Sequence, residues 1–211
     1  MKQNQTQIAY DYILNKITEN KIPQGYPVIE EDFAQQLNMS RTPVREAIKL
    51  LSVEGFIDIF PRKGAFVKVL SAQDISDCYE MIEAIEGMIA YLAAKNPSEE
   101  IIDQLNQYLD EMEKERKAMD FFSWKQNDIK FHRTIYKLCD NKLLIRHAEI
   151  LFLKIYQIET SYIHGVNLEQ AIKEHKLILE AIKNKDGEGA REYMQKNWHR
   201  ARLDVLKYAT Q

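Results

Sequence analysis

Apolar side chains recur at alternating steps of three and four residues through most of the chain beyond Ser71, which is the spacing of amphipathic helices. The 7 glycines and 5 prolines among 211 residues are too few for long loops or a β-rich fold. The sequence therefore predicts a mainly α protein in which residues 71–211 form an antiparallel bundle of about six helices. The first stripe comprises Ile75, Cys78, Ile82, Ile85, Ile89 and Leu92, and later helices are expected from Pro97 onward and over 121–139, 142–162, 168–183 and 186–208.

The N-terminal part of the chain shows shorter helical segments with breaks between them. A first helix is expected over residues 7–20, and a second over residues 30–37, after a stretch with two prolines and a glycine. Asn38 tolerates the left-handed conformation that a tight link often needs, and Ser40 can cap a third helix. Two helices joined by so short a link predict a helix-turn-helix.

The third expected helix, residues 40–54, has two chemically different faces. Its back is apolar and comprises Val44, Ala47, Ile48 and Leu51. Arg41 and Arg45 are four residues apart, so both guanidinium groups lie on the opposite face. Such a helix fits the DNA major groove, where arginine pairs bidentately with guanine and discriminates it by about 1–3 kcal/mol. The alternative is the solvated face of an ordinary amphipathic helix.

A β-hairpin is expected directly after this helix. Residues 57–60 and 65–69 read as two short strands, and the turn between them carries Arg62 and Lys63. A basic hairpin tip in this place is typical of a wing, which can reach phosphates or a minor groove. Residues 1–70 are therefore expected to form a winged helix-turn-helix DNA-binding domain.

Charge is distributed unevenly along the chain. Residues 40–70 hold six basic and three acidic side chains, a local net charge of +3, whereas the whole chain carries −3. This excludes a uniformly basic nucleic-acid binder and favours one DNA-facing end on an acidic body.

Three further features of the sequence indicate the cellular compartment of the protein. No apolar run reaches the length of a membrane span, and the first residues lack the apolar core of a signal peptide. A cytoplasmic protein without a membrane partner is therefore expected. Cys78 and Cys139 lie far apart within helical patterns, and they are expected to be buried, reduced thiols.

Polar residues interrupt the apolar stripes of two expected bundle helices. Asp128 and His132 lie one turn apart on the inward face of the first, and His175 lies on the inward face of the second. A buried, unpaired carboxylate is costly, so Asp128 needs a partner. Carboxylate and imidazole groups that converge in a bundle can bind a divalent metal, and two histidines favour zinc, nickel or iron over calcium or magnesium. The alternative is a hydrogen-bonded Asp–His network without a metal.

Two sets of residues match motifs of a known family. The first set is residues 39–47, Leu50, Leu51, Glu54, Gly55 and the wing residues 61–67. The second set is residues 127–132, Asn141, Glu174 and His175. With them the chain resembles the GntR family of bacterial transcription regulators, and more narrowly the FadR subfamily with its all-helical FCD effector domain. The resemblance covers nearly the whole chain.

The resemblance implies roles for the residues of the DNA-facing part. Arg41 and Arg45 would contact base edges, Ser40 and Thr42 would hold phosphates, and Gly64 would let the wing backbone approach the groove. Because a single small winged helix gives limited specificity, we expect a homodimer that reads a palindromic double-stranded operator.

The resemblance also implies a metal site, because members of the subfamily bind a metal through one aspartate and three histidines. Asp128, His132 and His175 match the first three positions. The fourth position falls on Asn197, which can ligate through its amide oxygen but binds more weakly than imidazole. His199 cannot simply replace it, since two residues along a helix rotate a side chain by about 200°. Zinc or nickel is the expected ion.

A second departure from the family concerns the effector. Many relatives carry arginine where this chain has Ile82, and that arginine is placed to meet an acidic effector. Its loss makes a highly anionic effector less favourable, although a bound metal could still recruit one carboxylate. A small organic acid is therefore the expected class of effector.

The leading hypothesis is a dimeric transcription regulator, by family default a repressor, whose affinity for DNA changes when a metabolite binds the helical domain. One alternative is a constitutive DNA-binding regulator with a vestigial effector domain, given Ile82 and Asn197. Another is a metal-dependent hydrolase, but the chain has no nucleophile elbow, phosphate loop or His-Glu-x-x-His stretch. We therefore expect that the protein is not an enzyme.

Overall fold

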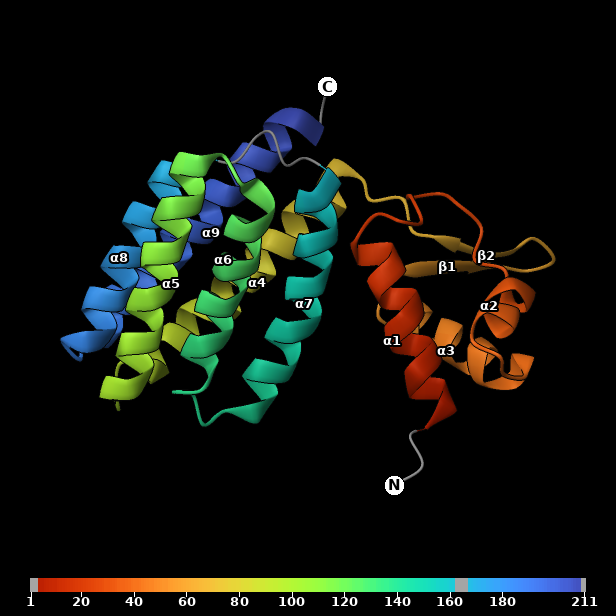
Figure 1. Cartoon of the computed structure of the whole chain (residues 1–211), viewed down its shortest axis with the longest axis horizontal. Helices are drawn as coiled ribbons and strands as arrows, with labels where there is room; N and C mark the ends of the chain where they lie inside the picture. The colour runs from red at the N-terminus through yellow and green to blue at the C-terminus, as the bar shows by residue number, and fades with distance from the viewer. Residues whose placement is uncertain (1–3, 162–166, 210–211) are drawn as a thin grey trace. The chain divides into compact units, whose positions relative to one another are not determined.

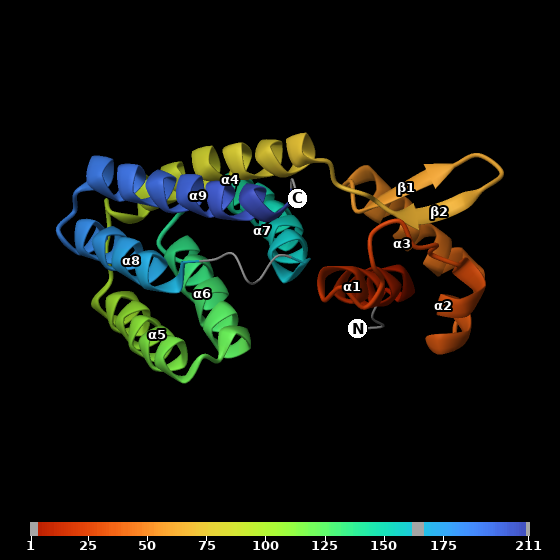
Figure 2. The same ribbon diagram turned by 90° about the horizontal axis from the view of Figure 1, so that it is seen from above.

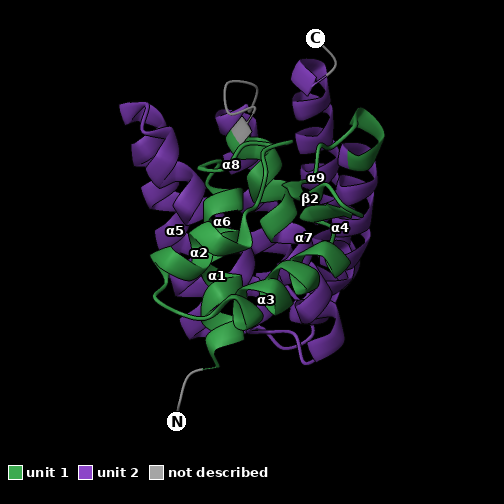
Figure 3. Ribbon diagram, turned by 90° about the vertical axis from the view of Figure 1, so that its right-hand side faces the viewer, with its two compact units in different colours: residues 1–74, 153–161 green, residues 75–152, 162–211 purple. Residues whose placement is uncertain are grey.

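The computed structural model describes residues 4–161 and 167–209. The chain divides into two units, one formed by residues 1–74 with 153–161 and the other by residues 75–152 with 162–211 (Figure 3). The segment 153–161 thus belongs to the first unit, which the boundary at residue 70 expected from the sequence does not include. Each unit is described below by itself.

The first unit holds the predicted helix-turn-helix and hairpin. Its elements are α1 (Gln5–Thr18), α2 (Glu30–Gln36), α3 (Arg41–Val53), β1 (Ile57–Phe60) and β2 (Gly64–Val67) (Figure 1). Helices α1 and α2 both pack against α3. The predicted apolar face of α3 is buried, and Asn38 adopts the expected left-handed conformation in the link, with a φ of 49°. The fold class predicted for this region is confirmed.

The hairpin differs from the prediction in its second strand. Strand β2 begins at Gly64, which pairs with Phe60, and it ends at Val67, although the backbone amide of Lys68 still donates to the carbonyl of Phe56 in the register of the hairpin. Residues 25–28 also pair with β2, through backbone hydrogen bonds of 2.8 Å from Gly25 to Val67 and from Val28 to Ala65. The sequence does not predict this third, strand-like segment, because Pro27 and the nearby Pro23 and Gly25 read as a break.

In the part of the chain that the structure describes, six helices follow the hairpin, as predicted. They are α4 (Ala72–Ala93), α5 (Glu99–Ala118), α6 (Phe121–Tyr136), α7 (Lys142–Ser161), α8 (Leu168–Lys183) and α9 (Gly187–Ala209). In the second unit, α5 packs against α6 and α8, and α8 packs against α9 (Figures 1 and 2). Side chains of Asp120 and Asn167 cap α6 and α8 by accepting backbone hydrogen bonds. Helix α7 is described to Ser161, and the predicted end at Tyr162 lies outside the described residues. None of the described helices combines the length and apolar character needed to span a bilayer.

Helix α4 buries Ile75, Ile82 and Ile89 as predicted, but not the whole predicted stripe. Its buried side chains include Ile75, Tyr79, Ile82, Glu86 and Ile89. The predicted members Cys78, Ile85 and Leu92 are only half-buried. The prediction was wrong here because it followed apolar residues and so passed over Glu86, which occupies the inward position one turn after Ile82. Cys139 is buried, as predicted. Cys78 was also predicted to be buried, but it is only partly buried.

Candidate functional site

The two arginines of α3 lie on its exposed face. Their side chains are 57% exposed for Arg41 and 53% exposed for Arg45, so both can meet an external partner. Each is already paired with a carboxylate of α2. Arg45 donates from Nε and Nη2 to both oxygens of Glu30, and Arg41 forms an ion pair with Glu31. The sequence did not predict these partners, because nothing in the spacing of α2 and α3 fixes how the two helices cross.

A groove of about 460 Å³ joins this helix to the hairpin. Its apolar lining includes Ile48 of α3 and Ile59 of β1. Its basic side chains are Arg45, Lys49 and Lys63. The structure thus brings Arg45 of α3 and Lys63 of the wing onto one surface, and it adds Lys49, for which the sequence predicted no role. Residues 61–64 of the wing are all exposed.

Ser40 occupies the N-cap position of α3 with an extended backbone, but its hydroxyl makes no capping hydrogen bond within the described part of the chain. The expected side-chain cap is therefore wrong. Ser40 and Thr42 are both exposed, so their hydroxyls are accessible to a partner outside the chain.

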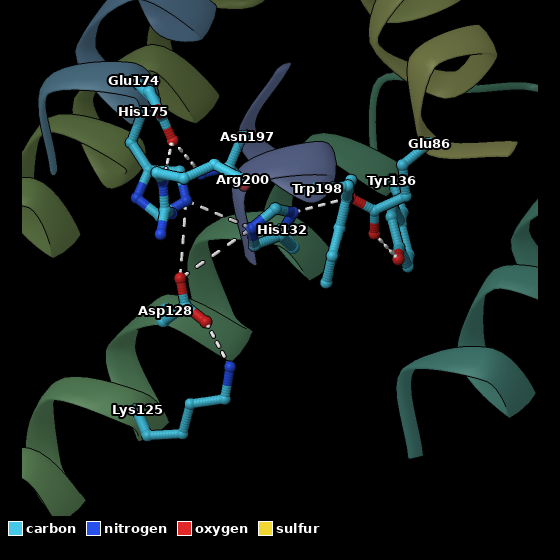
Figure 4. Close-up of polar contacts among 10 residues, drawn as sticks. All are labelled: Glu86, Lys125, Asp128, His132, Tyr136, Glu174, His175, Asn197, Trp198 and Arg200. Carbon is cyan, nitrogen blue, oxygen red and sulfur yellow. Dashed lines mark hydrogen bonds and ion pairs between the residues drawn. The ribbon is translucent and has the colours of Figure 1, made fainter. Parts of the chain in front are cut away.

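The three predicted metal-site residues converge in the second unit (Figure 4). Asp128 and His132 come from α6 and His175 comes from α8, and all three are buried. The two Nε2 atoms are 3.2 Å apart, and Oδ1 of Asp128 lies 3.4 Å from Nε2 of His175 and 3.8 Å from Nε2 of His132. Ligand atoms around a tetrahedral zinc ion, with bonds of about 2.05 Å, are separated by about 3.3 Å. The donor set and its spacing therefore fit a divalent transition metal.

Glu86 is the largest omission of the sequence analysis, because it organises one side of this cluster. Its carboxylate is fully buried and lies 2.6 Å from Nδ1 of His132. It also accepts hydrogen bonds from Nε1 of Trp198, at 2.8 Å, and from the hydroxyl of Tyr136. Because a carboxylate oxygen accepts in such a contact, we assign Nδ1 of His132 as the donor, and Nε2 is the atom that faces Asp128 and His175 (Figure 4). Glu86 could have been identified from the sequence, because it lies one helical turn after Ile82 within the apolar pattern of α4.

Burial and the neighbouring charges set the protonation of the cluster. Burial opposes ionisation of Asp128, but electrostatic interactions with Lys125, His132 and His175 and the hydrogen bond from Lys125 lower its pKa to about 2. Burial lowers the pKa of His175 to about 3, which keeps this imidazole neutral. Burial also disfavours a charged His132, yet the charge and hydrogen bond of Glu86 outweigh it and raise its pKa. A metal would therefore compete with a proton at His132 and meet a neutral imidazole at His175.

Replacing Glu86 with leucine should lower the free energy of unfolding of the helical unit by about 3–5 kcal/mol, because three buried donors lose their acceptor. Glu86→Gln, which keeps an acceptor, and Tyr136→Phe, which removes one donor, should cost about 1–2 kcal/mol each. Urea unfolding followed by tryptophan fluorescence measures the loss, since Trp124 and Trp198 are the chain's two tryptophans and both lie in this unit. Equal losses for Glu86→Leu and Tyr136→Phe would contradict the network.

Asn197 is buried beside a second polar network. Its amide nitrogen donates to Glu174 at 2.9 Å, which leaves the amide oxygen as the atom that could ligate a metal. Arg200 donates to the same Glu174 oxygen and to Asp204. His199, in contrast, is exposed and lies 3.7 Å from Glu83, so it points away as expected.

Ile82 stands where the family resemblance implies an arginine, but other helices of the bundle carry cationic side chains. Ile82 is fully buried on α4. The largely buried cations of other helices include Lys125 of α6, which bonds Asp128 at 2.7 Å, and Arg200 of α9. The lysine also supplies the partner that a buried Asp128 was expected to need. Neither cation was singled out from the sequence, where Lys125 reads as an ordinary surface lysine.

Comparisons with known proteins agree with both halves of this description. The chain is 29% identical to the HTH-type transcriptional repressor RspR of Escherichia coli (strain K12) over 192 residues, which cover 89% of this chain and 83% of that protein. It is 27% identical to the probable D-xylose utilization operon transcriptional repressor of Paenarthrobacter nicotinovorans over 178 residues, or 84% of this chain and 78% of that one.

Solved structures show the same fold. The structure of E. coli McbR/YncC matches with a TM-score of 0.83 at 20% identity, covering 99% of this chain and all of that one. The family described as bacterial regulatory proteins, gntR family, matches residues 5–67, and the FCD domain matches residues 77–200. The chain therefore belongs to the GntR family of DNA-binding transcriptional regulators and carries an FCD domain.

Proposed function

We propose that the protein is a cytoplasmic, homodimeric transcriptional repressor that releases a palindromic operator when a small organic acid binds its helical domain. The proposal rests on the presence of two sites in one chain. One is a groove lined by Arg45 of α3 and Lys63 of the wing, and the other is a buried cluster of one aspartate and two histidines. Relatives named as repressors support the sign of regulation.

The DNA-facing residues divide into readers and holders. Arg41 and Arg45 read base edges in the major groove, since arginine matches the two acceptors of guanine. Ser40 and Thr42 hold phosphates near the N-terminus of α3, where backbone N–H groups also favour an anion. On the wing, Arg62, Lys63 and Gly64 approach the sugar–phosphate backbone, and they fix position rather than sequence.

The effector side rests on the buried cluster. Asp128, His132 and His175 would hold zinc or nickel, with the amide oxygen of Asn197 as a weaker fourth ligand. Such an ion supplies positive charge and an open position for a carboxylate. Lys125 lies next to Asp128 and would add to the attraction for an anion. Binding a metal and an acid then shifts the population of the dimer away from the state that fits DNA.

Fluorescence anisotropy with a labelled duplex from the protein's own promoter region tests the coupling between effector and DNA. With zinc or nickel bound, at least one member of a panel of small organic acids should weaken DNA binding by about 5- to 150-fold. Two chains should bind each palindromic duplex. Unchanged DNA affinity across the panel, with and without metal, would instead support the constitutive regulator with a vestigial effector domain.

A further inference from the structure

The two base-reading arginines are held by neighbouring glutamates in different ways. Glu30 receives two nitrogens of Arg45, with Nε at 2.9 and 3.1 Å from its two oxygens and Nη2 at 2.7 Å. Glu31 contacts Arg41 through Nη2, and this side-chain pair is more exposed than the other. Glu30 therefore contacts Arg45 through two nitrogens, whereas the ion pair of the neighbouring Glu31 with Arg41 is formed through Nη2.

The contact with Glu30 leaves the outer edge of Arg45 available. A guanidinium group has five N–H donors, and Glu30 engages the Nε hydrogen and one hydrogen of Nη2. The remaining Nη2 hydrogen and those of Nη1 form the fork that pairs with guanine O6 and N7. Arg45 can therefore keep Glu30 and read a base at the same time, and its fork is already oriented before DNA arrives.

The contact with Glu31 has the opposite consequence. Its ion pair with Arg41 engages Nη2, and the described contacts show no second nitrogen of Arg41 bonded to Glu31, so the guanidinium is not held in one orientation as that of Arg45 is. The carboxylate of Glu31 is also half-exposed, and it would repel an approaching DNA backbone. DNA must displace or share this carboxylate before Arg41 can make its full contact.

The lining of the groove is a second difference between the two glutamates, because it includes Glu30 and not Glu31. Glu30 and Arg45 both line it, together with Lys63 and Gly64 of the wing. The hydrogen bond from Arg45 also lowers the pKa of Glu30, so this carboxylate stays ionised. Glu30 therefore sits as a permanent acceptor within the surface that faces DNA.

We propose that Glu30 is a positioning residue that orients Arg45 for guanine and so contributes to specificity, whereas Glu31 competes with DNA for Arg41 and limits sequence-independent affinity. The two neighbouring carboxylates then have separable effects. Removing the charge of Glu30 weakens discrimination between sequences, and removing the charge of Glu31 strengthens binding to every sequence.

The test compares Glu30→Gln and Glu31→Gln in the full-length protein. The probes are a duplex selected by the wild type from a randomised library and a scrambled duplex of equal length, titrated at several KCl concentrations. Glu19→Gln is the matched control, because it removes one exposed charge from the same unit, where Glu19 pairs with Lys21 rather than with a base-reading arginine. Circular dichroism melts check that each variant folds.

Glu30→Gln should reduce the ratio of selected to scrambled affinity by about 10-fold, close to the loss of one oriented arginine–guanine pair. Glu31→Gln should tighten both duplexes several-fold and steepen the dependence on salt, because more phosphate contacts form. Wild-type discrimination in Glu30→Gln, or unchanged affinity in Glu31→Gln, would overturn the inference.

Arg45→Ala on the same duplexes separates this inference from the proposed function. If Arg45→Ala loses discrimination and Glu30→Gln keeps it, only the positioning role is overturned. If Arg45→Ala binds like the wild type, the base contact itself is wrong. The double variant Glu30→Gln/Arg45→Ala should discriminate no worse than Arg45→Ala alone, since Glu30 acts through that arginine.

Discussion

Arg45→Ala should remove most of the protein's preference for its operator while leaving the fold intact. Arg45 is exposed on α3, so truncating it opens no cavity. Each lost arginine–guanine pair costs about 1–3 kcal/mol, which is about 5- to 150-fold in affinity for each half-site. In a dimer the loss occurs twice on one palindrome.

Anisotropy titrations with the selected and scrambled duplexes measure this loss as a ratio. Arg41→Ala should reduce the same ratio, whereas Lys21→Ala, which removes an exposed cation of the same unit, should leave it unchanged. A phosphate contact such as that expected for Lys63 should weaken both duplexes alike and lower the slope against salt. Retained discrimination in both Arg41→Ala and Arg45→Ala would show that α3 does not read bases as proposed.

His175→Ala should abolish the binding of zinc or nickel to the helical unit. The wild type, at a metal concentration 100 times the dissociation constant, gains about 2.7 kcal/mol, which raises the melting temperature by about 5–10 °C. His175→Ala removes one of three converging ligand atoms and should show no such shift. Metal analysis of the dialysed protein should give about one ion per wild-type chain and none for the variant.

Trp198 provides a second readout of metal binding. Its indole ring lies 5.0 Å from that of His132, between ring centroids, so nickel at the cluster should quench its fluorescence. Binding should also weaken on acidification. Because Glu86 raises the pKa of His132, this imidazole is protonated below that pKa, and the metal must then displace a proton. Quenching that persists in His175→Ala would place the metal elsewhere.

Asn197 offers a gain-of-affinity control for the same site. Imidazole binds zinc or nickel more strongly than an amide oxygen, so Asn197→His should tighten metal binding. Asn197→Ala should weaken it and also leave Glu174 without one of its donors. If Asn197→His and Asn197→Ala bind metal equally well, position 197 does not ligate the ion.

The sequence by itself determined the elements and the chemistry of both candidate sites. The apolar periodicity predicted six bundle helices, and the spacing of Arg41 and Arg45 predicted a basic face on α3. Asp128, His132 and His175 could be selected because each interrupts an apolar stripe. These inferences succeed because a helical repeat is local, and a few consecutive residues decide which side chains share a face.

Only the tertiary structure decided which partners those side chains have. Glu86, 46 residues before His132, sets the hydrogen on that imidazole, and Glu30 holds Arg45 from another helix. For the same reason Ile85, predicted to be inward, is only half-buried, whereas Glu86, for which no inward place was predicted, is buried. The rotation and crossing of packed helices come from the summed fit of many side chains, and no local spacing encodes them.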